Sequence, residues 1–267
     1  MQDLKDIKMI ATDMDGTFVG EGVFELSPED FELIRKLREK GIIFAVATGR
    51  GYGNTRRLFA PVADDILYIC DNGCNVMWQG KNLFRCPMNQ TVCSNLTDYI
   101  LALPPEYENV MCTADCYALM PKSSEEAVRI ARDWKMTIRI VNSMEEIGDE
   151  VIKHSVFHRG GIPEEFKEEM EKRWGNRVKH INCSTTEWLD LQDGDKGIAL
   201  QKAAEALGIE LKNVAVFGDN TNDIEMLDIA GFSFAMSHGH AEAKAHAKYT
   251  CSDVRDVLRE IIKEKSC

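Results

Sequence analysis

Short, continuous apolar runs alternate with helix-like segments in the first and last thirds of the chain. The runs read IKMIATDM, IIFAVATGR and ILYIC near the start, and NVAVFGDN and FSFAM near the end. Strands of a parallel sheet are buried on both faces by helices, so they read as unbroken apolar stretches. The pattern therefore predicts an α/β fold with a parallel sheet between two layers of helices.

The segments between these runs carry signals for helix ends. In SPEDFELIRKLREKG, Ser27 can cap a helix, Pro28 suits its first position, and Gly41 suits its end. KGIALQKAAEALGI has Gly208 near its end, and SDVRDVLREIIKEK is amphipathic. We expect a helix over each of these three segments.

The middle of the chain follows a different pattern. Between about residues 81 and 191, strand candidates such as YENVMCT, EVIKHSVFH and NRVKHINC mix polar and apolar residues. SSEEAVRIARDW and PEEFKEEMEKRW are helix candidates between them. Half-polar strands favour an antiparallel sheet that helices cover on one face. We expect a small α+β domain at 81–191, inserted into a core domain of residues 1–80 and 192–267.

Charge and composition narrow the classes of function. The 267 residues carry a net charge of −12 and no basic stripe, so a nucleic-acid partner is not expected. No apolar run approaches the ~18 residues of a membrane span, and the start does not resemble a signal peptide. The nine cysteines form no CxxC pair, which favours reduced thiols and a cytoplasmic protein. A zinc site at Cys112 and Cys116 lacks a second suitable pair.

Chemically notable residues follow the predicted strands. Parallel strands bring their carboxyl ends to one edge of the sheet, where ligands bind in open α/β folds. Several acids, a lysine and a hydroxyl therefore meet at this edge, from the segments TDMDGT, ATGR, GDKG and GDNTND. The residues are Asp13, Asp15, Thr48, Gly49, Arg50, Lys196, Asp219, Asn222 and Asp223.

Each of these residues alone has an ordinary structural explanation, such as a turn, a helix cap or a solvated charge. Together their charges compensate. Carboxylates can hold a hard cation such as Mg²⁺, and a lysine with a hydroxyl can hold a phosphate beside it. An aspartate in that position can attack phosphorus, and a second one can transfer the proton.

The four segments, in this order, resemble the motifs of the haloacid dehalogenase superfamily. DMDGT is similar to its first motif, ATGR to the second, the lysine of GDKGIAL to the third, and GDNTNDIEML to the fourth. An insertion between the second and third motifs resembles the Cof-type members (class IIB, with a C2-type cap). DNGC resembles the NG motif at the entrance of that cap.

This resemblance implies a Rossmann-like core with an inserted cap and a role for each residue. Asp13 would be the nucleophile and Asp15 the general acid and base. Asp13, Asp219 and the main-chain carbonyl of Asp15 would bind Mg²⁺. Phosphate would bind to Thr48, Gly49, Lys196 and Asn222, with Asp223 in support and Arg50 near the substrate. The family implies hydrolysis of phosphate monoesters, such as sugar phosphates or other small phosphorylated metabolites.

Other functions stay open at this point. A phosphotransferase or phosphomutase of the same superfamily would share the aspartyl phosphate. A non-catalytic sugar-phosphate-binding protein would not need an intact set of Asp13, Asp15, Lys196 and Asp219. A nucleotide-dependent oxidoreductase fits poorly, because GRGYGN lacks the GxGxxG spacing. A glycosidase would leave Lys196 without a role.

The stretch after FSFAM departs from the family pattern. His240 and Ala241 stand where the family commonly has Asn-Ala. His238, His240 and His246 could bind zinc, but we favour His240 as the cap of the next helix. Substrate choice should depend on the inserted domain, whose motion would hinge near Gly73. His154, His158, Trp188 and Tyr117 are candidate contacts there, although each is more readily explained as a core or surface residue.

Overall fold

A computed structural model describes residues 4–20, 25–120, 125, 129, 136–148 and 150–266. The chain divides into two compact units. The core unit comprises residues 1–50, 55–84 and 195–267, and the inserted unit comprises residues 51–54 and 85–194. The sequence places an insertion at 81–191, and its role as a cap domain remains a prediction.

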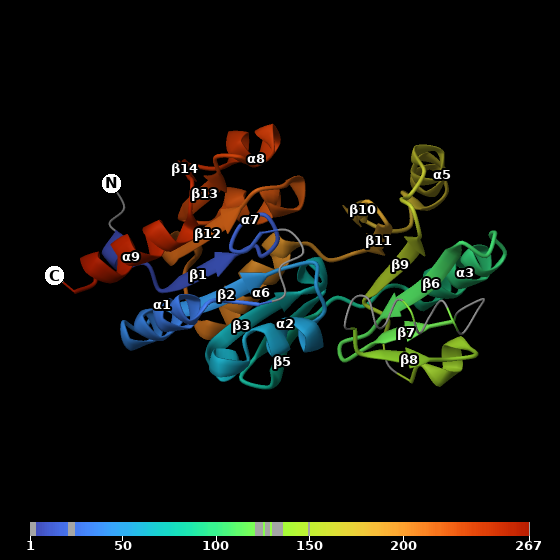
Figure 1. Ribbon diagram of the computed structural model, residues 1–267, viewed down its shortest axis with the longest axis horizontal. Coiled ribbons are helices and arrows are strands. Elements are labelled where there is room, and N and C mark those ends of the chain that lie inside the picture. The colour runs from blue at the N-terminus through green and yellow to red at the C-terminus, as the bar shows by residue number, and fades with distance from the viewer. Residues whose placement is uncertain are drawn as a thin grey trace. The chain divides into compact units, whose positions relative to one another are not determined.

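The sheet of the core unit has the strand order β14-β13-β12-β1-β2-β3-β4-β5 (Figure 1). Every pairing from β14 to β3 is parallel, which confirms the predicted parallel sheet. β4 pairs antiparallel with β3 and belongs to a hairpin that the sequence pattern does not predict. The strands are β1 (Met9–Thr12), β2 (Ile43–Ala47), β3 (Ile66–Cys70), β4 (Asn75–Trp78), β5 (Lys81–Arg85), β12 (Val214–Gly218), β13 (Phe232–Met236) and β14 (Tyr249–Cys251).

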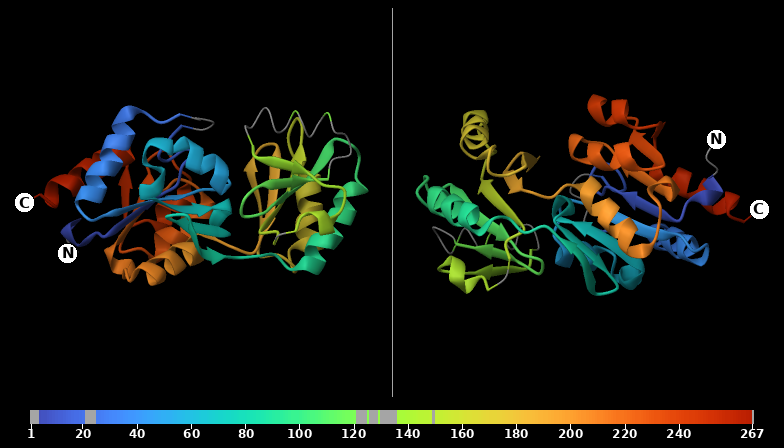
Figure 2. Two further views of the ribbon diagram at one scale, coloured as in Figure 1. Left: turned by 90° about the horizontal axis from the view of Figure 1, so that it is seen from below. Right: turned by 180° about the vertical axis from the view of Figure 1, so that it is seen from behind.

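Helices cover both faces of this sheet. Figure 2 shows α1 (blue) on one side of the strands and α6 (orange) on the other. The helices are α1 (Pro28–Glu39), α2 (Tyr52–Leu58), α6 (Lys196–Leu207), α7 (Ile224–Ile229), α8 (Ala241–His246) and α9 (Val254–Glu264). Short 3-10 turns lie at Leu4–Asp6, Ala60–Asp65, Asp71–Gly73, Leu211–Asn213 and Thr221–Asp223.

The helix ends follow the predicted signals. The Ser27 hydroxyl accepts a hydrogen bond from the Asp30 amide, and the Asp30 carboxylate accepts one from the Ser27 amide at 2.9 Å. This reciprocal pair satisfies two amide groups at the start of α1. Gly208 ends α6 in the left-handed conformation, with φ of 66°, which costs glycine little. Both helix ends are therefore confirmed.

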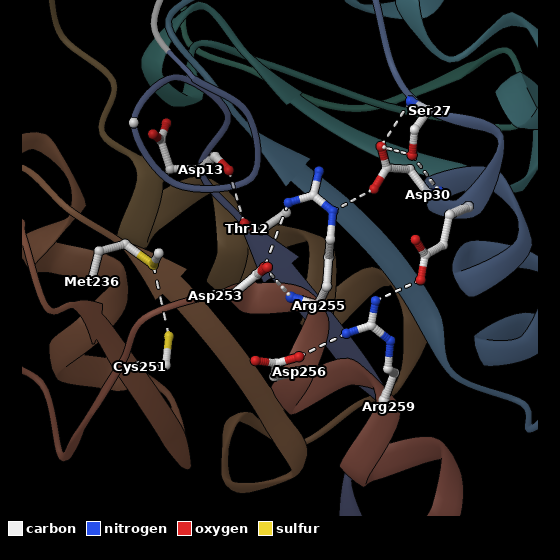
Figure 3. A network of polar contacts seen from close by, with 12 residues as sticks. Thr12, Asp13, Ser27, Asp30, Met236, Cys251, Asp253, Arg255, Asp256 and Arg259 are labelled. Atoms are coloured by element: carbon white, nitrogen blue, oxygen red, sulfur yellow. Dashed lines mark hydrogen bonds and ion pairs between the residues drawn. The ribbon is translucent and has the colours of Figure 1, made fainter.

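A polar network ties α1 to α9 (Figure 3). Arg255 Nε donates to Asp30 Oδ1 at 2.7 Å, and the guanidinium lies 4.9 Å from the centre of the Phe18 ring. Burial raises the pKa of Asp30, but hydrogen bonds from Arg255 and Ser27 outweigh it and lower the pKa below its usual value. The ionised carboxylate therefore stabilises the folded core unit.

The inserted unit contains a sheet in the order β10-β11-β9-β6-β7-β8. Its pairings are antiparallel except for β7 with β8, which run parallel. Of the predicted helix SSEEAVRIARDW, all but Glu125 and Arg129 lie outside the described residues. The elements are α3 (Gln90–Leu101), α5 (Glu164–Trp174), β6 (Tyr107–Cys112), β7 (Tyr117–Leu119), β8 (Ile138–Ile140), β9 (Lys153–His158), β10 (His180–Thr185) and β11 (Trp188–Gln192), with a 3-10 turn at Met144–Glu146.

The apolar face of this second sheet packs against α3 and α5. Leu189 and Leu191 of β11 share one cluster with Leu96 of α3 and Met170 of α5. The helices of the inserted unit therefore bury one face of their own sheet.

None of the helices in the described part of the chain has both the length and the apolar character needed to cross a lipid bilayer.

The prediction that only one face of this sheet is covered is wrong, because residues on the other face of β9 and β11 are also buried. Lys153, Ser155 and Asp190 are buried there. The Ser155 hydroxyl donates to Asp190 Oδ1 at 2.5 Å, and Lys153 Nζ lies 3.4 Å from Asp190 Oδ2. This pairing of opposite charges offsets part of the cost of burying them.

Candidate active site

The predicted site residues come from four loops at one edge of the core sheet. Asp13 follows β1, Thr48 follows β2, Asp219 follows β12, and Lys196 is the first residue of α6. The parallel pairing of β12, β1 and β2 brings the first three loops to the same edge. The structure therefore gathers residues that lie far apart in the sequence.

Lys196 is the central cation of the site. Its side chain is fully buried, and Nζ donates to Asp13 Oδ1 at 2.7 Å and to Asp223 Oδ1 at 2.6 Å. Burial lowers the pKa of Lys196, but the charges and hydrogen bonds of Asp13 and Asp223 outweigh it and raise the pKa above its usual value. Lys196 therefore carries a positive charge at any physiological pH.

The carboxylates exceed the charge of this one lysine. Asp13, Asp219 and Asp223 each offer an oxygen, and these three oxygens lie within 4.8 Å of one another. Burial is the main cause that raises the pKa of Asp13 well above its usual value, and Asp223 and Asp219 add to it against the effect of Lys196. Burial and the charge of Asp223 also raise the pKa of Asp219. A divalent cation would offset this repulsion and favour the charged forms.

Asp223 supports its neighbours through both oxygens. Oδ1 accepts from Lys196, and Oδ2 accepts from the backbone amides of Asp219 at 2.9 Å and Asn220 at 3.1 Å. These bonds order the loop that carries Asp219. Asp223 thus contacts Lys196 and the loop of Asp219, and its supporting role in the reaction stays a prediction.

Three glycines pack so closely against the acids that a side chain would not fit in their place. A Cβ atom at Gly16 would lie 2.6 Å from Asp219 Oδ2, and one at Gly218 would lie 2.5 Å from Asp223 Cβ. A Cβ atom at Gly239 would lie 2.6 Å from the backbone oxygen of Asp219. On the same side, the Thr17 hydroxyl donates to Asp219 Oδ1 at 2.6 Å. Thr17, to which the sequence motifs assign no role, thus fixes the carboxylate of Asp219.

Asp15 faces Arg50 rather than the acid cluster. Arg50 Nε donates to Asp15 Oδ2 at 2.9 Å, and Nη2 donates to Asp15 Oδ1 at 2.6 Å. Two parallel bonds of this kind fix both the position and the plane of a carboxylate. The guanidinium of Arg50 therefore orients Asp15, and the predicted position of Arg50 near the substrate stays a prediction.

The predicted phosphate-binding groups gather around a turn. Thr48 is 1% exposed, and its hydroxyl accepts from the Arg50 amide at 3.1 Å. Asn222 Nδ2 donates to Asn72 Oδ1 at 3.3 Å, and a Cβ atom at Gly49 would lie 3.0 Å from the same oxygen. Asn72, the asparagine of the DNGC segment that resembles the NG motif, therefore lies between Gly49 and Asn222.

Comparison with known proteins identifies the family. The model of the haloacid dehalogenase-like hydrolases matches residues 10–259. The chain belongs to this family. 5-Amino-6-(5-phospho-D-ribitylamino)uracil phosphatase YbjI of Escherichia coli (strain K12) is 26% identical over 266 residues, covering 97% of this chain and 98% of that protein. Pyridoxal phosphate phosphatase YbhA of the same strain is 26% identical over 264 residues, covering 92% and 93%.

A solved structure supports the same assignment. A protein from Eubacterium rectale is 31% identical to this hydrolase and superposes with a TM-score of 0.84, covering 97% of this chain and 99% of that one. The predicted superfamily and the α/β fold are confirmed by these matches.

The histidines of this haloacid dehalogenase-like hydrolase have separate partners. His240 is the N-cap of α8, where its Nδ1 accepts from the Glu242 amide at 3.3 Å, and this confirms the predicted cap. His238 Nε2 lies 2.8 Å from the Gly16 carbonyl oxygen, and His246 Nδ1 lies 2.8 Å from Asp228 Oδ1.

Two of the candidate substrate contacts, His154 and His158, have partners within the inserted unit. His154 is fully buried with Nε2 3.2 Å from the Thr97 hydroxyl, and burial lowers its pKa to about 3. His158 Nδ1 lies 2.7 Å from the Gly161 carbonyl oxygen. Structural roles within the inserted unit account for these contacts.

Proposed function

We propose that this hydrolase is a Mg²⁺-dependent phosphatase that cleaves phosphate monoesters of small metabolites, including sugar phosphates, through an aspartyl-phosphate intermediate. The observation that carries the proposal is the cluster of three carboxylates, two of them buried and hydrogen-bonded to Lys196 and the third, Asp219, half-buried beside them. Its excess negative charge suits a divalent cation, and its lysine suits a phosphoryl group held beside that cation.

The residues fit such a cation. Asp13 and Asp219, together with the backbone carbonyl of Asp15, would hold it, because both oxygens of Asp223 already accept hydrogen bonds. When bound, Mg²⁺ would neutralise negative charge on the phosphoryl oxygens. Thr17 and Gly16 keep the carboxylate of Asp219 in place for this role.

In the first step, a carboxylate oxygen of Asp13 attacks phosphorus. A bond forms between Asp13 and phosphorus, and the bond from phosphorus to the leaving oxygen breaks. Asp15 donates a proton to that oxygen, so the alcohol leaves neutral. Arg50 orients the Asp15 carboxylate.

In the second step, water attacks the phosphorus of the aspartyl phosphate. Asp15 takes a proton from that water, the bond between phosphorus and Asp13 breaks, and inorganic phosphate is released. Lys196 stabilises negative charge on the phosphoryl oxygens in both steps, and Thr48, Gly49 and Asn222 hold the phosphate. A phosphotransferase or mutase would differ only in the acceptor of this second step.

The relatives support a small phosphorylated substrate. One acts on a ribitylaminouracil phosphate and another on pyridoxal phosphate. We propose that selection among such metabolites depends on the inserted unit acting as a cap, because the core unit supplies the groups that hold the phosphate. A hinge near Gly73 would allow that unit to open for substrate exchange.

Phosphate release from a panel of monoesters tests the proposal. The panel contains sugar phosphates, pyridoxal phosphate, FMN, nucleotides and 5-amino-6-(5-phospho-D-ribitylamino)uracil, each with Mg²⁺ or with EDTA. We expect release that needs Mg²⁺ and that is lost in Asp13→Asn. Release from no member of the panel would count against a phosphatase. An aspartyl phosphate trapped without phosphate release would favour the phosphotransferase.

A further inference from the structure

The turn Asp71–Gly73 has an unusual backbone. Asp71, Asn72 and Gly73 have φ values of 51°, 50° and 95°, so three consecutive residues lie in the left-handed region. Residues other than glycine rarely adopt this region, and it persists where the surrounding structure enforces it. Asparagine tolerates it better than most side chains. Some contact of this turn must therefore hold the conformation.

Backbone hydrogen bonds hold the turn against the loop after β2. The Asn72 amide donates to the Thr48 carbonyl oxygen at 2.9 Å, and the Asp71 amide donates to the Arg50 carbonyl oxygen at 3.1 Å. The turn also lies against the start of α6, where a Cβ atom at Gly73 would be 2.1 Å from the Asp195 carbonyl oxygen. It thus contacts the segments that carry Thr48 and Lys196.

The Asn72 side chain adds a third contact. Asn72 is 6% exposed, and its Oδ1 accepts from Asn222 Nδ2 at 3.3 Å. The same oxygen closes the space beside Gly49, where a Cβ atom would lie 3.0 Å away. One buried amide therefore contacts two of the residues proposed to hold the phosphate.

We propose that Asn72 is a positioning residue for the phosphate: its side chain orients the amide of Asn222 and fixes the loop at Gly49. This inference rests on the proposed function, because Gly49 and Asn222 hold phosphate only in that proposal. The left-handed backbone is what aims the Asn72 amide at both residues at once. Asn72 itself does not react.

The test compares two substitutions of left-handed residues. Asn72→Gly removes the side chain but permits the same backbone, because glycine adopts positive φ at little cost. Gln79→Gly is the matched control, since Gln79 has φ of 49° and is exposed in the turn between β4 and β5. Binding of inorganic phosphate with Mg²⁺ is measured by calorimetry. We expect Asn72→Gly to weaken it about three- to tenfold, as for the loss of one hydrogen bond. Gln79→Gly should bind as the wild type does.

A double-mutant cycle tests whether Asn72 acts through Asn222. Asn222→Ala should weaken phosphate binding, and Asn72→Gly should add little to that loss. Fully additive losses, or wild-type binding by Asn72→Gly, would overturn the inference. If Asn72→Gly does not fold, Asn72→Ser removes the amide acceptor that Asn222 bonds while adding no charge. Its phosphate binding should be weaker than that of the wild type, and wild-type binding by this variant would overturn the inference.

The same titration separates this inference from the proposed function. A wild type that binds phosphate but hydrolyses no monoester would contradict the phosphatase, while weaker binding by Asn72→Gly would still support the positioning role. Normal hydrolysis with unchanged binding in Asn72→Gly would overturn the positioning role alone. A wild type that binds no phosphate would overturn both.

Discussion

Both units of this hydrolase bury a lysine beside a carboxylate, but the two clusters differ in how closely their acids converge. In the core unit, Lys196 bonds two acids, with the third carboxylate of the cluster nearby. In the inserted unit, Lys153 lies 3.4 Å from Asp190 Oδ2, and Glu108 is also buried, in the adjacent strand β6. Among the described residues, the group of three acids whose oxygens lie within 4.8 Å of one another is in the core unit. Close convergence of acids, and not burial alone, is therefore the mark of the candidate site.

The positions of the charges differ as well. The core acids stand in loops after parallel strands, where side chains from several elements can converge. Asp190 stands within β11, directly opposite Ser155 of β9, which donates a hydrogen bond to it. A polar group inside a sheet has its neighbours fixed by register, which suits a structural pair better than a substrate.

The largest effect that tests this contrast is the loss of turnover in Asp13→Asn. We expect kcat to fall by about 10⁴-fold or more, as for the removal of a nucleophile. Stability should not decrease, because the substitution removes one of the repelling charges. Phosphate release and thermal unfolding measure the two effects. Substantial turnover in this variant would remove Asp13 from the role of nucleophile.

Lysine removal in each unit sharpens the comparison. Lys196→Ala should lower kcat by about 10²–10³-fold, and it should cost about 3–5 kcal/mol of stability because two buried acids lose their partner. Lys153→Ala is the matched variant, which should lose stability but keep kcat/KM. Both are measured by denaturant unfolding and steady-state kinetics. A similar rate loss in both variants would contradict the distinction between a chemical and a structural lysine.

Acid should weaken the inserted unit through His154. Its folded pKa is about 3 against an ordinary value of 6.5, so below pH 6.5 the unfolded chain binds a proton that the folded chain does not. Stability should therefore fall as the pH drops from 6.5 towards 3, by about 3–5 kcal/mol in total. His154→Leu should flatten this dependence in denaturant unfolding followed across that range. An unchanged slope in the variant would contradict the assignment.

The smallest of these effects concerns Asp30 in the core unit. Asp30→Asn should cost about 1–2 kcal/mol at neutral pH, because the charged bonds to Arg255 and Ser27 are lost. The folded pKa of Asp30 is lowered, so its contribution is present above its unfolded pKa of 3.8 and disappears as the pH falls through the lower folded value. Unfolding curves of wild type and variant should therefore converge in acid. A difference that persists there would assign the effect to packing.

The two units also differ in how far sequence could predict them. Motifs DMDGT, ATGR, GDKG and GDNTND identified the acids and Lys196, because each follows a clear apolar run or opens a helix. The β4–β5 hairpin, α3 and β11 were not predicted. β11 reads WLDLQ. Its alternation of apolar and polar residues is short and overlaps the predicted domain boundary at 191, so the pattern did not indicate a separate strand.

Contacts between residues on different loops could not be predicted from the sequence. Nothing in the motifs pairs Arg50 with Asp15, Thr17 with Asp219, or Asn72 with Asn222. These pairs depend on how loops after different strands face each other, and spacing along the chain carries no record of that. The sequence shows which residue types these loops contain, but not which residues they contact.

The glycines packed against the acids set the tolerance of the site to mutation. Gly16, Gly218 and Gly239 each leave less than 3 Å for a single added carbon beside Asp219 or Asp223. In a selection for activity, alanine at these three positions should therefore be as deleterious as asparagine at the acidic positions. A change of substrate specificity in this scaffold would have to come from substitutions at other residues, because the space around the acids is already filled.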